Sequence, residues 1–113
     1  MFRDEEQTHR AIRTLLDTIP GLGRYWTDTG PTEEAGRVVE QRGGALSSGE
    51  ALLVRVAFDL WNGRGGADFG RVVHTLGSEP LAALGALLVA MSHPDDAGID
   101  QWLARHARPT SPR

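Results

Sequence analysis

Apolar residues recur at helical spacing in several segments of the chain, and glycine, proline or capping residues separate these segments. The first runs from Asp4 to Ile19, with acidic residues in its first turn and Pro20-Gly21 after it, so we expect a helix over 4–19. The spacing predicts an inner face of Thr8, Ile12, Leu15, Leu16 and Ile19, and it places His9 and Arg13 on a charged face. Residues 21–31, GLGRYWTDTGP, lack this spacing and are expected to form an irregular loop.

Residues 32–42 have a thinner apolar face. With Thr32 as the cap and Ala35, Val38 and Val39 pointing inward, the segment predicts a second helix that ends at Gly43-Gly44. A short strand over residues 37–41 is the alternative.

The stretch Ser47–Gly66, SSGEALLVRVAFDLWNGRGG, contains an almost wholly apolar run between a serine-glycine-glutamate start and a glycine-rich end. Ser47 and Glu50 form a capping-box pattern, which predicts a helix over 48–62 that ends at Gly63 with a left-handed residue. Arg55 and Asp59 are the only polar residues between Ala51 and Trp61, and their spacing of four predicts that they pair with each other. A helix that is apolar nearly all round is expected to lie buried in the centre of a bundle.

Three further helices are expected after the glycine-rich loop. Asp68 is expected to cap a short helix that Gly77 closes, with its apolar residues at helical spacing: Phe69, Val72, Val73 and Leu76. Ser78 is expected to cap a helix over 79–92. Its bulky core side consists of Leu84, Leu87, Leu88 and Met91. Its small-residue side, suited to close approach of a neighbour, consists of Ala82, Gly85, Ala86 and Ala90. Asp95 or Asp96 caps a last helix reaching 107, with an inner face of Ile99, Trp102, Leu103 and His106.

These segments together predict an all-α fold. We expect a compact bundle of five to six short helices around the buried central helix 48–62. Residues 1–107 are expected to form a single helical domain, and residues 108–113, RPTSPR, a disordered C-terminal tail.

The composition excludes several kinds of chemistry. The 113 residues include no cysteine, which excludes disulfides, thiolate metal sites and cysteine nucleophiles. All 12 basic residues are arginine, so Schiff-base chemistry and a phosphate-loop lysine are excluded too. The longest uncharged apolar run, Leu81–Met91, is too short to cross a bilayer, and the acidic start of the chain does not fit an export signal. We therefore expect a cytoplasmic protein without membrane contact.

The segment Phe58–Leu76, FDLWNGRGGADFGRVVHTL, resembles an EF-hand, with a helix, a glycine-bearing loop and an aspartate-phenylalanine pair leading into a second helix. The resemblance implies a calcium loop in which Leu60, Asn62, Arg64 and Arg71 occupy the first, third, fifth and twelfth ligand positions. Calcium needs oxygen ligands and normally a bidentate glutamate at the last position. The ligand pattern therefore fails, and the sequence predicts a helix-loop-helix without metal.

Other motifs give weaker signals. The loop Gly63–Gly70 is rich in glycine, but Asp68 stands where a dinucleotide fingerprint needs glycine, and a helix precedes the loop. A metal at His93, Asp95 and Asp96 competes with helix capping by the two aspartates, which is the simpler interpretation. We expect no catalytic residue, no cofactor and no metal.

The residue types that anchor protein interfaces gather at two places in the sequence. Arg24, Tyr25 and Trp26 are adjacent in the predicted loop, and Trp61 and Arg64 follow the central helix, so these five are the predicted partner-binding residues. The alternative is that Trp26 and Trp61 close the core under a loop.

We therefore expect a small non-enzymatic interaction module, a regulator, adaptor or accessory factor, that binds a protein partner or forms a homo-oligomer. One alternative is a nucleic-acid-associated regulator with clustered arginines such as Arg64 and Arg71, although the net charge of −3 disfavours it. The other alternative is a degenerate EF-hand-like protein or a small metal-binding enzyme.

Overall fold

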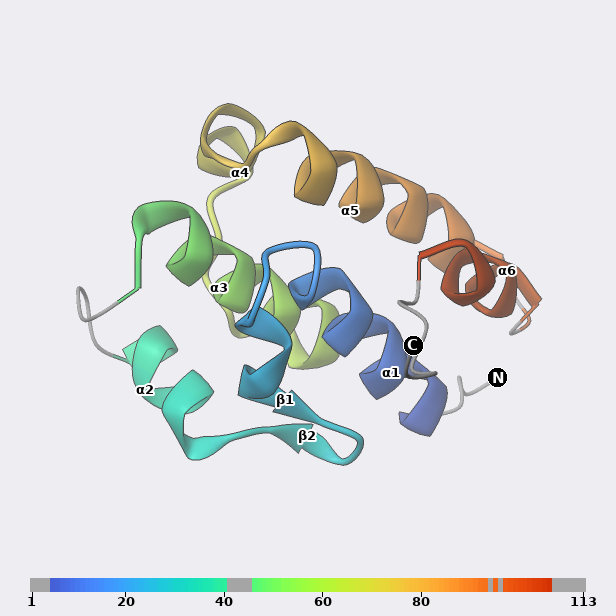
Figure 1. Cartoon of the computed structure of the whole chain (residues 1–113), viewed down its shortest axis with the longest axis horizontal. Coiled ribbons are helices and arrows are strands. Elements are labelled where there is room, and N and C mark those ends of the chain that lie inside the picture. Colours follow the sequence, from blue (N-terminus) through green and yellow to red (C-terminus); the bar gives the residue numbers. More distant parts are fainter. Residues whose placement is uncertain (1–4, 41–45, 94, 96, 107–113) are drawn as a thin grey trace, which may run out of the picture.

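The computed structural model describes residues 5–40, 46–93, 95 and 97–106 (Figure 1). Its helices are α1 (Glu5–Leu16), α2 (Glu33–Glu40), α3 (Ser48–Asn62), α4 (Phe69–Thr75), α5 (Ser78–Met91) and α6 (Ala97–His106). A 3-10 turn, η1 (Leu22–Tyr25), leads into a two-stranded antiparallel ribbon, β1 (Trp26–Thr27) and β2 (Gly30–Pro31). The expected all-α bundle is confirmed, whereas the expected tail 108–113 lies outside the described residues.

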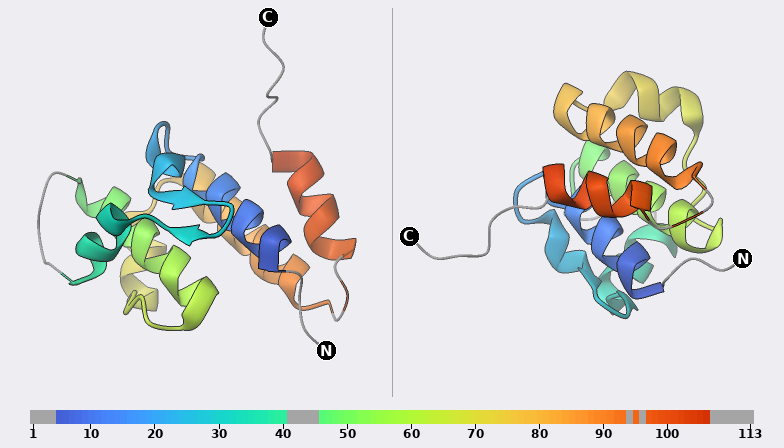
Figure 2. Two further views of the ribbon diagram at one scale, coloured as in Figure 1. Left: turned by 90° about the horizontal axis from the view of Figure 1, so that it is seen from below. Right: turned by 90° about the vertical axis from the view of Figure 1, so that its right-hand side faces the viewer.

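The central position belongs to α3 and α1 together. Helix α3 packs against α1, α2 and α4, and its residues Leu53, Val54 and Ala57 are fully buried. Helix α1 contacts α5, α6, η1 and β1 as well as α3, and Figure 2 shows the ribbon lying alongside α1. None of the helices in the described ranges is long and apolar enough to cross a membrane.

Helix α1 is shorter than expected and buries more of its surface. It ends at Leu16 because Asp17 turns to accept a hydrogen bond from the Gly23 N–H (3.1 Å) and Thr18 donates its hydroxyl to the Leu15 carbonyl (2.7 Å). Gln7 is also buried and donates its Nε2 to Asp100 Oδ1 (2.6 Å), which ties α1 to α6.

The segment after Thr32 is a helix, so the strand alternative is wrong. Thr32 Oγ1 accepts the Ala35 N–H (3.2 Å), as expected for a helix cap, and Ala35 is fully buried. The expected end at Gly43-Gly44 lies outside the described residues.

Local capping chemistry fixes both ends of α3 as expected. Ser47 Oγ accepts from the Glu50 N–H (3.2 Å), and Glu50 Oε1 accepts from the Ser47 N–H (2.9 Å), which completes the capping box. At the other end Gly63 adopts a left-handed φ of 76° and donates its N–H to carbonyls of the last turn.

The α4–α5 region departs from the sequence predictions. Asp68 precedes α4 without a side-chain capping bond, and Gly77, not Ser78, is the residue before α5. Val72 is buried, but Phe69 is 75% exposed and Val73 is exposed too, so half of the expected inner face of α4 points outward. The physical reason is that α4 is short and has α3 as its main helical neighbour, which covers one side only.

Helix α6 closes the bundle through Trp102, which is fully buried and donates its indole N–H to the Ala83 carbonyl of α5 (3.0 Å). The predicted small-residue contact of α5 is present in part. Gly98 of α6 lies so close to the Ala90 carbonyl oxygen that a Cβ there would be 2.7 Å away, but Ala82 and Gly85 are exposed. Of the predicted bulky side, Leu84 and Leu87 are buried, whereas Leu88 points outward.

Candidate functional site

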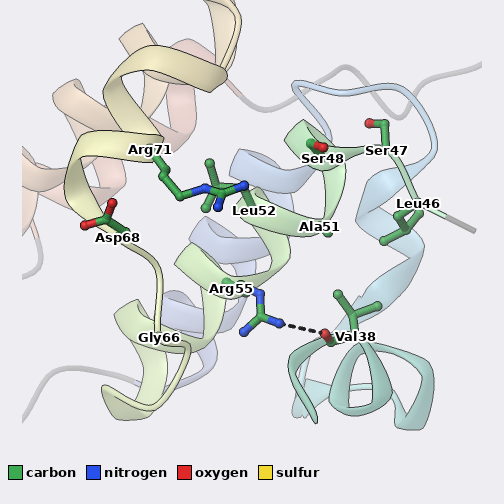
Figure 3. Close-up of a pocket in the computed structure, with 10 residues that line it drawn as sticks. All are labelled: Val38, Leu46, Ser47, Ser48, Ala51, Leu52, Arg55, Gly66, Asp68 and Arg71. Atoms are coloured by element: carbon green, nitrogen blue, oxygen red, sulfur yellow. Dashed lines mark hydrogen bonds between the residues drawn. The ribbon is translucent and has the colours of Figure 1, made fainter. Parts of the chain in front are cut away.

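The glycine-rich loop after α3 is held by two side chains of α3 itself. Asp59 accepts three backbone N–H groups through its two carboxylate oxygens, from Gly65 (2.7 Å), Gly66 (3.2 Å) and Ala67 (3.0 Å). Arg55 donates to the Gly65 carbonyl (3.2 Å) and to the Val38 carbonyl of α2 (3.3 Å; Figure 3). Both residues therefore bind backbone groups of neighbouring segments.

The predicted pairing of Arg55 with Asp59 is wrong. Among the ranges that the structure describes, no ion pair within 4.0 Å joins them, because each is engaged with the loop. The loop amides that a phosphate would need already bind the Asp59 carboxylate. The geometry thus gives no support to a nucleotide-binding interpretation of Gly63–Gly70.

The expected helix-loop-helix order is present in α3, the loop and α4, and the loop binds an internal carboxylate. Asp59 lies before the predicted ligand positions and is occupied by backbone N–H groups. In the part of the chain that the structure covers, no three His, Asp or Glu side chains lie close enough to hold a metal ion. Asp95 accepts the Ala97 N–H (3.1 Å) at the start of α6, as helix capping predicts, and Asp96 lies outside the described residues.

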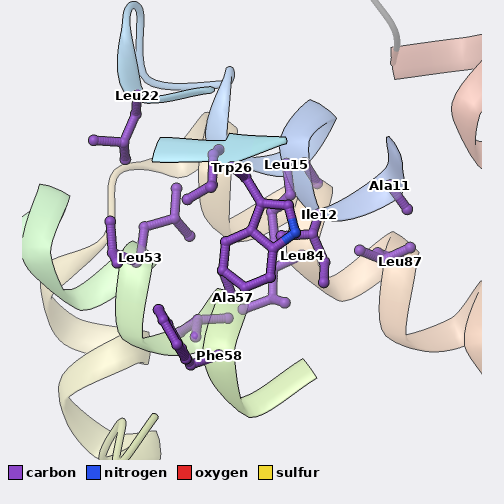
Figure 4. Close-up of a cluster of buried hydrophobic side chains, with 14 of the residues drawn as sticks. Ala11, Ile12, Leu15, Leu22, Trp26, Leu53, Ala57, Phe58, Leu84 and Leu87 are labelled. Carbon is purple, nitrogen blue, oxygen red and sulfur yellow. The ribbon is translucent and has the colours of Figure 1, made fainter. Parts of the chain in front are cut away.

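Trp26 is a core residue. Its side chain is 1% exposed and lies between α1 and α3, with Ile12, Leu15 and Phe58 around the indole (Figure 4). The expected irregular loop over 21–31 is instead ordered by η1 and by the β1–β2 pairing, which turns Trp26 inward and Thr27 outward, and Tyr25 is buried too. The alternative that Trp26 closes the core is confirmed.

His9 is the residue of this region that sequence reasoning misplaced. It is 4% exposed, and its Nδ1 accepts the Trp26 indole N–H (3.0 Å) in the core, so the expected charged face of α1 does not include it. The spacing along the sequence indicates this burial, since His9 is three residues before Ile12 and seven before Leu16, which puts all three on one helical face.

Trp61 links this buried pair to the surface. Its ring centre lies 5.8 Å from that of Trp26, 5.9 Å from that of Phe58 and 6.2 Å from that of His9, yet the side chain is 41% exposed. A hollow of about 230 Å³ beside it is lined by Glu5, Thr8, His9, Leu60, Trp61 and Met91. The structure thus brings two of the five predicted partner-binding residues, Trp26 and Trp61, into one aromatic cluster.

The other predicted residues lie apart from that cluster. Arg24 is exposed and stacks over its neighbour Tyr25, with the guanidinium carbon 5.0 Å from the ring centre. Arg64 is exposed in the glycine loop, and its backbone N–H donates to Asn62 Oδ1 (2.9 Å). Arg24, Trp61 and Arg64 are accessible to a partner, and their role in binding stays a prediction.

No protein-family model, no curated protein and no solved structure matches this chain. The fold itself is a helical bundle with a small β-ribbon.

Proposed function

We propose that the protein is a non-enzymatic interaction module whose first partner is a second copy of itself, bound through the outer face of α5. The observation that carries this proposal is the exposure of large apolar side chains in the second half of that helix. Leu88 is 45% exposed and Val89 is 65% exposed. Two adjacent apolar side chains left in water on a regular helix favour contact with another surface.

Gly85 in the middle of α5 also favours this face as the contact surface. Glycine inside a helix costs roughly 1 kcal/mol relative to alanine, so its presence usually needs a packing reason. Gly85 is exposed, and a Cβ built on it would meet nothing within 4 Å inside the chain. A helix of a second copy that crosses α5 closely at Gly85 would supply the missing reason.

Charge and size favour self-pairing of this face. No charged residue lies between Glu79 and Met91, so two copies facing each other through α5 bring no like charges together along that stretch. In an antiparallel arrangement centred near Gly85, Val89 of each copy lies next to the small Ala82 of the other. The face can therefore pair with itself without bringing like charges together along that stretch.

The expected dimer is weak. Helix α5 is about 21 Å long. One face of a single helix of this length offers less contact area than the roughly 800 Å² that each partner buries in a standard interface. We therefore expect a dissociation constant in the micromolar range or weaker, on the order of 10 to 100 μM.

Val89→Glu tests this proposal. Sedimentation equilibrium from about 1 μM to about 1 mM should show a monomer–dimer equilibrium for the wild type. The dimer dissociation constant of the variant should be at least about tenfold higher than that of the wild type. The matched control is Val73→Glu, which places the same charge on an exposed valine of α4 and should leave the equilibrium unchanged. Circular dichroism verifies that both variants fold.

A wild-type protein that stays monomeric at about 1 mM would contradict self-association. An equal shift in both glutamate variants would contradict the assignment to the α5 face. A third result is a monomeric chain that binds a different protein, with Val89→Glu abolishing that binding and Val73→Glu preserving it. Such a result would show that the α5 face is a binding surface and that its partner is not a second copy.

A further inference from the structure

A groove of about 430 Å³ opens between α2, the start of α3 and α4, and no residue of α5 lines it. Its lining includes two arginines and an aspartate together with apolar side chains and two serines: Arg55, Arg71, Asp68, Val38, Leu46, Ala51, Leu52, Ser47, Ser48 and Gly66 (Figure 3). Its volume lies in the range of pockets that take small organic molecules.

Arg71 is the cation of this groove that has no polar partner among the described residues. Within the described residues it makes no hydrogen bond and no ion pair, although Asp68 precedes it by three positions on the same helical turn. Figure 3 shows the Arg71 side chain reaching from α4 toward Leu52 of α3, with the Asp68 carboxylate turned the other way. The guanidinium therefore faces the groove with its hydrogen-bond donors unoccupied.

Arg55 supplies a second positive charge from the opposite wall. Two of its N–H groups bind the Gly65 and Val38 carbonyls, which fixes a half-buried guanidinium at the edge of the groove. The planar fork of an arginine has further N–H donors. The carbonyls carry no net charge, and among the described residues the Asp59 carboxylate one helical turn away binds the loop amides and makes no ion pair with Arg55 within 4.0 Å. Two arginines therefore line one groove.

The floor between the two arginines is apolar. Leu52 is buried and Ala51 and Val38 are half-buried, so an apolar body lying on them would be shielded from water. Two guanidinium groups beside an apolar floor suit a molecule with an oxyanion at one end and an apolar group at the other.

We propose that this groove binds a small organic oxyanion, with its phosphate or carboxylate at Arg71 and Arg55 and its apolar part on Leu52 and Val38. This site is independent of the α5 face, so either proposal can fail without the other. Asp68 lies at the rim, and its negative charge opposes the binding of such a ligand.

Amide and arginine-side-chain NMR signals followed during titration with phenyl phosphate, benzoate and inorganic phosphate test the proposal. Phenyl phosphate should shift the signals of Ser48, Ala51, Arg55 and Arg71, and inorganic phosphate should bind about tenfold more weakly because it has no apolar part. The comparison with benzoate establishes whether phosphate or carboxylate is preferred.

Three variants sharpen the experiment. Arg71→Gln should weaken phenyl phosphate binding about tenfold, and Asp68→Asn should strengthen it about twofold by removing a repelling charge. Arg10→Gln is the matched control, because it removes the same charge from an exposed arginine of α1 that does not line the groove. Its affinity should equal that of the wild type.

Absence of shifts at the groove residues with about 50 mM phenyl phosphate would overturn the proposal. So would equal weakening by Arg10→Gln and Arg71→Gln, because it would indicate attraction to the general surface charge. Thermal unfolding of each variant separates loss of binding from loss of fold, since Arg71 makes no hydrogen bond or ion pair within the described residues that its substitution would break.

Discussion

Gly65→Ala is expected to lower the free energy of unfolding by about 3 kcal/mol. A Cβ at this position would overlap the carbonyl oxygen of Arg55 and lie 2.9 Å from the backbone nitrogen of Asp59. Both atoms belong to the backbone of α3 and cannot rotate away. The loop would have to move off α3, which would break the hydrogen bonds that Asp59 and Arg55 make to it.

Urea unfolding followed by circular dichroism measures this loss. Gly36→Ala is the matched control, because a Cβ on Gly36 meets nothing within 4 Å inside α2. Alanine is the better helix former there, so the control should gain up to about 1 kcal/mol. A Gly65→Ala midpoint equal to that of the wild type would show that the loop does not pack on α3 as described.

The features that could be predicted from the sequence depend on neighbours along the chain. The capping box of Ser47 and Glu50 and the left-handed Gly63 need only residues within a turn of each other, so their pattern determines their geometry. The apolar residues nearly all round α3 likewise predict its burial, because such a helix has no broad polar face to turn toward water.

The errors arise where a distant segment decides the outcome. Asp59 is polar at a helical spacing from Arg55, but the loop beyond Gly63 folds back and occupies its carboxylate. The apolar spacing of α4 marks Phe69 and Val73 as it marks Val72, and only the packing partner decides which side is covered. The groove could not be predicted for the same reason, since its walls come from α2, α3 and α4.

Trp26→Ala is expected to remove about 4 kcal/mol of stability, a large share of what a domain of this size has. The indole is almost completely buried, its ring meets Phe58 edge-on at 5.2 Å, and its N–H is bonded to His9. Truncation leaves a cavity between α1 and α3 and a buried His9 nitrogen without its donor. Chemical unfolding at low protein concentration, where any dimer is dissociated, is the appropriate measurement.

Trp61→Ala is the informative comparison, because it removes the same residue type from the same aromatic cluster at a position that is partly in water. The Trp61 ring contacts Trp26 and Phe58, yet the exposure of Trp61 limits the expected loss of unfolding free energy to about 1 kcal/mol. Trp26→Phe should fall between the two, since it keeps an aromatic ring and loses the N–H that His9 accepts. Equal losses for Trp26→Ala and Trp61→Ala would contradict a buried Trp26. The expected order means that a binding defect of Trp26→Ala reports a damaged core, so that of the two tryptophans only Trp61 can probe contact with a partner.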